Sequence, residues 1–206
     1  MIEWGIIKTI LSGAANIFGF LIKKLRRPKI ETPRAPANIF EHIKPYASIS
    51  RIKEILGNPC REENNTQYFR FKDALVQVVY DGIDTIQSVS VALPAMSLWA
   101  RFPVPPTKFI LGKTTVADFW SDELTWNKDG SSKYTLYWIG RYFGYPGNYW
   151  HYTFGLYEGP GVSMPQFEWD YKNHCLTSDP KNVKFNWVTI ACDEGTGGIN
   201  NPFVFL

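Results

Sequence analysis

Three features of the sequence predict an α+β fold: a domain of short helices on an antiparallel sheet, carried by an N-terminal membrane helix. The first 27 residues form an apolar run that ends in a basic cluster. Two later segments, 48–57 and 114–122, space their apolar residues as helices do. Each is followed by runs that alternate apolar and polar residues, which is the two-residue period of a half-buried strand.

The segment Met1–Arg27 has the length and composition of a membrane helix. Between Glu3 and Lys23 its only charged residue is Lys8. About twenty apolar residues, each rising roughly 1.5 Å, match the hydrocarbon core of a bilayer. Its basic cluster follows the apolar run, whereas a secretory signal peptide carries positive charge before it.

The basic cluster also predicts the orientation of this helix. Because basic residues stay on the cytoplasmic side, we expect a single-pass protein of the inner (cytoplasmic) membrane with its C-terminal domain in the cytoplasm. The side chains expected to contact anionic lipid headgroups are Lys23, Lys24, Arg26 and Arg27.

Small and polar residues recur every three or four positions along the same helix. Small residues at this spacing let two helices approach closely in lipid, and an asparagine can hydrogen-bond across the contact. The residues expected to support self-association into a homo-oligomer are Gly5, Thr9, Ser12, Gly13, Asn16 and Gly19. A plain anchor, an amphipathic helix lying in the interface and a helix docked on a soluble partner are the alternatives.

The charge distribution separates the N-terminal segment from the rest of the chain. Residues 1–37 hold seven Lys or Arg and two Glu, whereas the remainder holds 15 basic and 17 acidic residues. A domain with this balance lacks the basic surface of a nucleic-acid-binding protein. We expect a proline-containing linker over residues 28–37 and one folded domain over 38–206.

The folded domain shows a weak internal repeat. Residues 48–93 and 114–157 each run from a capped short helix through a polar turn to antiparallel strands, and Ile52 and Val116 align at an offset of 64. Further strands are expected at Gln166–Tyr171, Cys175–Ser178, Lys184–Cys192 and Phe203–Leu206. The pattern is compatible with a structural duplication.

The first of these units resembles a known bacterial repeat. The motif comprises Ser48, Ile52, Leu56-Gly57, Pro59, Tyr68, Arg70-Phe71 and Val76-x-Val78-x-Tyr80-Asp81-Gly82. It is similar to the helix-plus-sheet unit of the β-lactamase inhibitory protein and of SmpA/OmlA-type outer-membrane assembly lipoproteins. This resemblance implies tandem units that form a concave sheet, with helices on one face, and a sheet that grips a partner protein.

Aromatic residues are concentrated in the segment Tyr134–Tyr157, where they make up eleven of 24 residues. Alternation along the strands sends some of these rings into a core and displays the others. Displayed tyrosines and tryptophans are common interface anchors, although aromatic residues also simply favour strands. The partner-binding candidates are Trp138, Tyr142, Trp150 and Tyr152.

Catalytic signals are sparse, and the sequence predicts no metal site and no cofactor. Cys175 or Cys192 with His151 would make a thiol–imidazole pair, the basis of a hydrolase as an alternative function. The leading expectation is a non-enzymatic, membrane-anchored protein-binding module, acting as a self-associating effector or a sensor. A soluble complex subunit that docks through its N-terminal helix is the third alternative.

Overall fold

A computed structural model of the chain describes residues 32–94, 99–119, 126–131, 134–145, 148–159, 161–162, 167–173 and 175–193. The predicted membrane helix, Met1–Arg27, lies outside these residues, and so do the proposed association and lipid-contact positions. Among the residues that are described, no helix has the length and apolar character needed to cross a bilayer. The described residues after Thr32 belong to a single compact unit, Pro33–Leu206.

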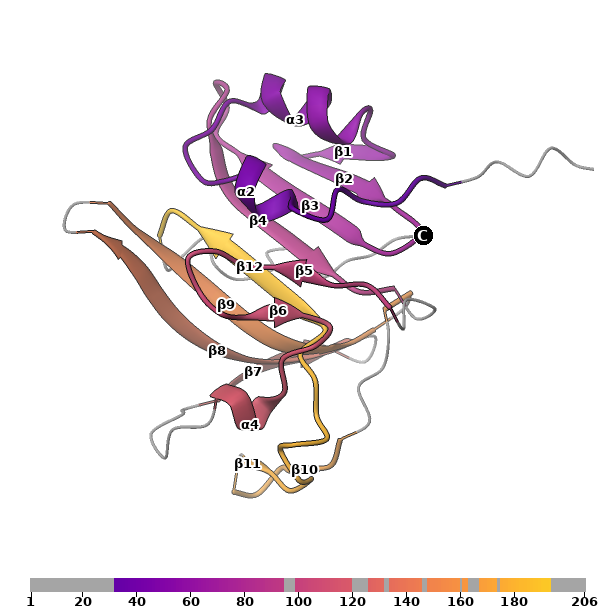
Figure 1. The fold of residues 1–206 in the computed structure, drawn as a ribbon, viewed down its shortest axis with the longest axis vertical. Helices are drawn as coiled ribbons and strands as arrows, with labels where there is room; N and C mark the ends of the chain where they lie inside the picture. The colour runs from indigo at the N-terminus through magenta and orange to yellow at the C-terminus, as the bar shows by residue number, and fades with distance from the viewer. Residues whose placement is uncertain are drawn as a thin grey trace, which may run out of the picture. The chain divides into compact units, whose positions relative to one another are not determined.

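This unit is dominated by an antiparallel sheet of eight strands (Figure 1). The order across the sheet is β1-β2-β3-β4-β12-β9-β8-β7. The first four strands are β1 (Arg61–Glu63), β2 (Thr66–Arg70), β3 (Leu75–Tyr80) and β4 (Ile86–Ala92). The other four are β7 (Asn127–Ser131), β8 (Tyr134–Tyr145), β9 (Asn148–Glu158) and β12 (Trp187–Ala191). The α+β class and the antiparallel sheet are therefore confirmed, and the described part is mostly sheet.

Each half of the sheet is preceded by a short helix. Within the described residues the helices are α2 (Ile39–His42) and α3 (Ile49–Leu56) before the first half and α4 (Val116–Phe119) before the second. Strands β1 to β4 follow α3 from the edge inwards, and β7, β8, β9 and β12 follow α4 in the same sense. The fourth strand of the second set, β12, lies beyond the segment 114–157 in which we expected the second unit.

Local sequence signals explain the ends of the helix α3. The Ser48 side chain accepts a hydrogen bond from the Ser50 backbone N–H, so Ser48 is the N-cap. Gly57 ends the helix with a φ of 78°, and its N–H donates to the Lys53 carbonyl. A glycine tolerates this left-handed conformation without the steric cost of a Cβ.

The helix α4 begins with a similar arrangement. The Asp118 N–H donates to Thr115 Oγ1 at 3.3 Å, and the Thr115 N–H donates to Asp118 Oδ2 at 2.7 Å. This reciprocal pair satisfies N–H groups that the first turn of a helix leaves without partners.

One face of the sheet, which we call the core face, packs against the helices and the connection between the two halves. Figure 1 shows α2, α3, α4 and the two-stranded sheet of β5 (Phe102–Pro103) and β6 (Ile110–Leu111) on this face. Strand pairing aligns one apolar residue from each of six neighbouring strands across it: Phe69, Val76, Val91, Val188, Phe154 and Ile139. The proline-rich connection thus packs across the domain, with Phe102 and Phe109 buried.

The opposite face, the second face, carries a smaller apolar cluster at one end and small polar residues near its centre. The cluster comprises Leu75, Ala92, Leu136, Tyr157, Val162 and Trp187. Beside it, Ser90 and Thr189 are buried and lie 2.6 Å apart between their hydroxyl oxygens. The Trp187 indole donates to the same Thr189 hydroxyl at 2.9 Å.

Two C-terminal segments lie outside the main sheet. We expected Gln166–Tyr171 and Cys175–Ser178 as strands, and the structure pairs only β10 (Trp169–Asp170) with β11 (Cys175–Leu176) in a separate ribbon. The Asp170 side chain closes their turn by accepting from the backbone N–H groups of Lys172 and Asn173. The expected strand at Phe203–Leu206 lies outside the described residues.

The linker expected at residues 28–37 contacts the domain in its described part. The Lys72 N–H donates to the Pro33 carbonyl, and the Ala35 N–H donates to Asp73 Oδ1. Ala35 is also buried. These contacts attach residues 33–35 to the turn between β2 and β3, so the chain there is less exposed than a free linker would be.

Candidate functional site

The two longest strands, β8 and β9, form a hairpin that extends past its neighbour in the sheet. Strand β12 pairs with β9 only from His151 to Gly155, whereas the β8–β9 pairing continues to Tyr145 and Asn148. Figure 1 shows the resulting projection beyond the end of β12. We call residues 142–145 and 148–151 the hairpin tip. Its backbone is held by the β8–β9 ladder.

On the core face, the hairpin tip forms one wall of a pocket of about 240 Å³. The pocket is lined by Lys44, Pro105, Pro106, Phe143, Gly144, Trp150 and Tyr152. Lys44 follows the helix α2 and the two prolines connect β5 to β6, so three separate parts of the chain meet here. Apart from Lys44, the lining side chains are apolar or aromatic.

Tyr152 contributes a buried, well-packed wall of the pocket. Tyr152 is completely buried, and its hydroxyl donates to the Pro105 carbonyl at 3.1 Å. Burial raises the pKa of this phenol to about 12, because a charged phenolate would lose its hydration. The Phe143 ring packs edge-on against Tyr152, with 5.1 Å between ring centroids. These contacts fix the aromatic wall before any ligand arrives.

Two polar groups of the pocket residues have no ion-pair partner or hydrogen-bond acceptor among the described residues. The Lys44 ammonium lies 5.8 Å from the centre of the Trp150 ring and makes no ion pair within the described part of the chain. The Trp150 Nε1–H is buried and has no hydrogen-bond acceptor. Trp126 and Trp169 share this last property, but neither lines the pocket. Because Trp150 Nε1 is shielded, Lys44 is the polar group that a ligand in the pocket would meet.

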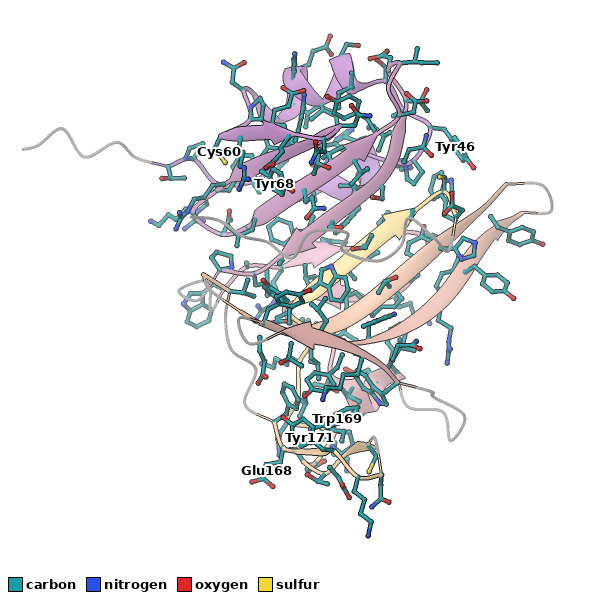
Figure 2. All side chains as sticks on the ribbon, turned by 180° about the vertical axis from the view of Figure 1, so that it is seen from behind. Tyr46, Cys60, Tyr68, Glu168, Trp169 and Tyr171 are labelled. Atoms are coloured by element: carbon teal, nitrogen blue, oxygen red, sulfur yellow. The ribbon has the colours of Figure 1, made fainter. Side chains whose placement is uncertain are left out.

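The second face of the hairpin tip displays aromatic side chains. Tyr142 is 69% exposed and Tyr149 is 45% exposed, and their rings make an edge-to-face contact at 6.3 Å. The His151 ring lies 5.5 Å from the Tyr142 ring. Tyr46, which is 58% exposed, lies toward the same side of the molecule (Figure 2). Large, rigid and half-polar side chains of this kind are frequent anchors in protein interfaces.

The structure places the four partner-binding candidates in three different settings. Trp150 and Tyr152 line the pocket, and Tyr142 lies on the exposed surface behind it. Trp138 is opposite Gly155 on the second face, where it packs against the cluster that contains Trp187. The hairpin therefore brings Tyr142 and Trp150 to its tip, places Tyr152 directly after the tip on β9, and leaves Trp138 further along β8.

Sequence reasoning missed the non-aromatic half of the pocket. Lys44 and the pair Pro105–Pro106 are 61 residues apart, and neither forms a motif with Trp150. Only the packing of α2 and of the β5–β6 connection on the core face brings them together. The alternation of β8 could have indicated Phe143, because it lies on the same face of the strand as the buried Tyr137 and Ile139.

The cysteines proposed for a hydrolase have other neighbours. Cys192 Sγ lies 2.9 Å from Gln87 Oε1, and Cys175 is an exposed residue of the separate β10–β11 ribbon. Cys60 contacts the Tyr68 carbonyl, and Figure 2 shows it far from Tyr46. Among the described residues, the His151 ring contacts Tyr142, at 5.5 Å between ring centroids.

Comparison of the chain with protein-family models, with curated proteins and with solved structures finds no match.

Proposed function

We propose that this protein is a non-enzymatic protein-binding module, carried at the membrane by its N-terminal helix, and that the hairpin tip is its binding site. The observation that supports the proposal is the pairing of an exposed tyrosine surface with an apolar pocket on the two faces of one rigid hairpin. Interfaces commonly combine such a pocket, which accepts an anchor, with aromatic residues around it. The sequence-based resemblance to partner-gripping sheets agrees with this proposal.

The edges of the sheet favour recognition by side chains over pairing with a partner strand. The two edge strands are β1 and β7. All three residues of β1 are exposed and charged, and β7 has the polar sequence Asn-Lys-Asp-Gly-Ser. Short, charged or polar edges discourage the addition of another strand. The aromatic hairpin tip is the more suitable contact surface.

Photocrosslinking in cells would test the proposal. A photoreactive phenylalanine analogue replaces Tyr142 or Tyr149 in separate full-length variants, and Tyr171 serves as a matched control because it is an exposed tyrosine on the β10–β11 turn. We expect the same protein adduct from both hairpin positions and not from Tyr171. Absence of adducts at both positions, or the same adducts at Tyr171, would refute the proposal.

The same assay separates binding from the hydrolase alternative. Trp150→Ala should remove the adduct, whereas Cys175→Ser and Cys192→Ser should leave it unchanged. A cellular activity that is lost in a cysteine variant but kept in Trp150→Ala would instead support a thiol hydrolase.

The placement at the membrane needs its own measurement. A single cysteine at Ala37, in a chain without Cys60, Cys175 and Cys192, is treated in intact cells with a membrane-impermeant maleimide. Labelling only after lysis would support a cytoplasmic domain, and labelling before lysis would contradict it. Extraction at high pH without detergent would indicate a helix that docks on a protein and does not insert into the bilayer.

A further inference from the structure

We propose that the pocket at the hairpin tip recognises an apolar carboxylate, meaning a compact hydrophobic group that ends in –COO⁻. The C-terminal residue of a polypeptide and a free small carboxylic acid both have this chemistry. The inference deepens the proposed function, and it rests on that function where the ligand is taken to be the C-terminus of a protein partner.

The size and walls of the pocket define the apolar half of the ligand. Its volume of about 240 Å³ is below the roughly 300–1,000 Å³ of pockets for drug-sized molecules. It therefore suits a single side chain. Its walls are rings and prolines, and the Tyr152 hydroxyl is already bonded to the Pro105 carbonyl. The walls consequently favour a hydrophobic group over a polar one.

The charge at the pocket defines the other half of the ligand. Among the described residues that line the pocket, Lys44 is the one with a formal charge, and none is a carboxylate. Arg141 is paired with Tyr152 across the β8–β9 ladder, so it adds a second cation on the same face of the hairpin. Since neither cation has an ion-pair partner among the described residues, an anion would gain an attraction that the protein itself leaves unused.

The Trp150 ring supplies an apolar surface beside this charge, 5.8 Å from the Lys44 ammonium. Its Nε1–H is buried out of reach of a ligand, so the ring and not this donor would contact the ligand. A neutral amide would fill the same apolar space, and its carbonyl would accept from Lys44, but it would lack the charge–charge attraction of a carboxylate. A cationic ligand is disfavoured, because Lys44 already lies over the Trp150 ring.

The test uses the indole N–H signals of the full-length protein, uniformly labelled with ¹⁵N. The chain has eight tryptophans, and the signal that disappears in Trp150→Phe belongs to Trp150. The probes are N-acetyl-phenylalanine and its neutral amide, N-acetyl-phenylalaninamide. We expect the acid to shift the Trp150 signal saturably, at about millimolar concentration, and the amide to bind roughly tenfold more weakly.

Variants at Lys44 test the charge directly. Lys44→Met should weaken binding of the acid about tenfold and remove the difference in affinity between acid and amide. Lys44→Arg keeps the charge, so it should retain most of the affinity for the acid. Lys128→Met is the matched control, because Lys128 also lies over an aromatic ring, at 4.2 Å from the centre of Tyr171, but outside the pocket. Unchanged signals from the other seven tryptophans show that each variant is folded.

Two results would overturn the inference: equal binding of acid and amide, or an unmoved Trp150 signal at saturating acid. The source of the ligand is read from two further probes. A peptide that ends in phenylalanine and binds at least tenfold more tightly than phenylacetate indicates a polypeptide C-terminus, whereas equal affinities indicate a free acid. Crosslinks at Tyr142 that persist while the acid fails to bind would refute this inference and leave the proposed function intact.

Discussion

Replacing Gly155 with alanine tests how the second face of the sheet is packed. Gly155 lies in β9 between two tryptophans of the neighbouring strands, opposite Trp187 on one side and Trp138 on the other. A Cβ at this position would lie 2.1 Å from Trp187 Cε3 and 2.5 Å from Cζ3. Non-bonded carbon atoms normally stay about 3.5–4.0 Å apart, so the indole must move by more than 1 Å, as a rough estimate.

The cost of that movement has two parts. Trp187 is only 1% exposed, and forcing an extra carbon into such a site typically costs about 1–3 kcal/mol. Moving the indole also disturbs its hydrogen bond to Thr189, which contributes about 1 kcal/mol. We therefore expect Gly155→Ala to lower the free energy of unfolding by roughly 2–4 kcal/mol.

Reversible denaturation in guanidinium chloride, followed by tryptophan fluorescence, measures this loss. The matched control is Gly140→Ala on the adjacent strand, where an added Cβ meets no atom within 4 Å. Because alanine restricts the unfolded chain more than glycine does, this variant should be neutral or more stable by up to about 1 kcal/mol. Equal losses for the two variants would contradict the packing described here.

A double-mutant cycle makes the test specific to the Trp187 ring. Trp187→Leu removes the two ring atoms that the new methyl group would meet, so the double variant should lose less stability than the sum of the two single variants. Additive losses would refute the reasoning, because they would mean that Gly155 and Trp187 do not share this contact.

Three further predictions concern local structure and titration. Ser48→Ala should cost about 1 kcal/mol of unfolding free energy through loss of the α3 cap, whereas the neighbouring Ser50→Ala should cost less. Burial raises the pKa of Glu158, so the folded protein holds this proton more tightly than the unfolded chain does. The free energy of unfolding should therefore fall as pH rises from the ordinary carboxyl pKa through the pKa in the folded state. Glu158→Gln should remove that loss in a pH series of denaturation midpoints. Hydrogen bonds from backbone N–H groups, chiefly that of Thr85, lower the pKa of Asp81. The stabilisation by Asp81 is therefore present above the ordinary carboxyl pKa and is lost as pH falls through the pKa in the folded state. If the parent protein and Asp81→Ala lose stability in acid to the same extent, this prediction is wrong.

Local signals in the sequence predicted single elements well. The helix α3 forms where Ser48 and Gly57 bracket an apolar face, because a cap and a stop act within a few residues of the helix. The hairpin from β3 to β4 follows from Asp81, whose carboxylate accepts three successive backbone N–H groups of the turn. Alternation along β8 and β9 likewise assigned Tyr152 and Phe154 to one face of the hairpin.

The arrangement of these elements was decided by contacts between distant residues. Strand β12 lies between β4 and β9, almost a hundred residues after its partner β4, and no local pattern specifies such a pairing. The segments around Trp169 and Cys175 have strand-like composition, yet they pair with each other outside the main sheet. A high β-propensity makes a segment able to form a strand, but the strand with which it pairs depends on the rest of the fold.

The sequence by itself thus determined the class of this domain, the places of its capped helices and the concentration of aromatic residues on one hairpin. Those properties follow from periodicity and from hydrogen bonds over a few residues. Only the tertiary structure decided that Trp150 borders a pocket with Lys44 and Pro105, while Trp138 packs beside Gly155. The reason is physical: a pocket is the space left where separate segments pack, so its lining is fixed by long-range packing, which no single stretch of sequence encodes.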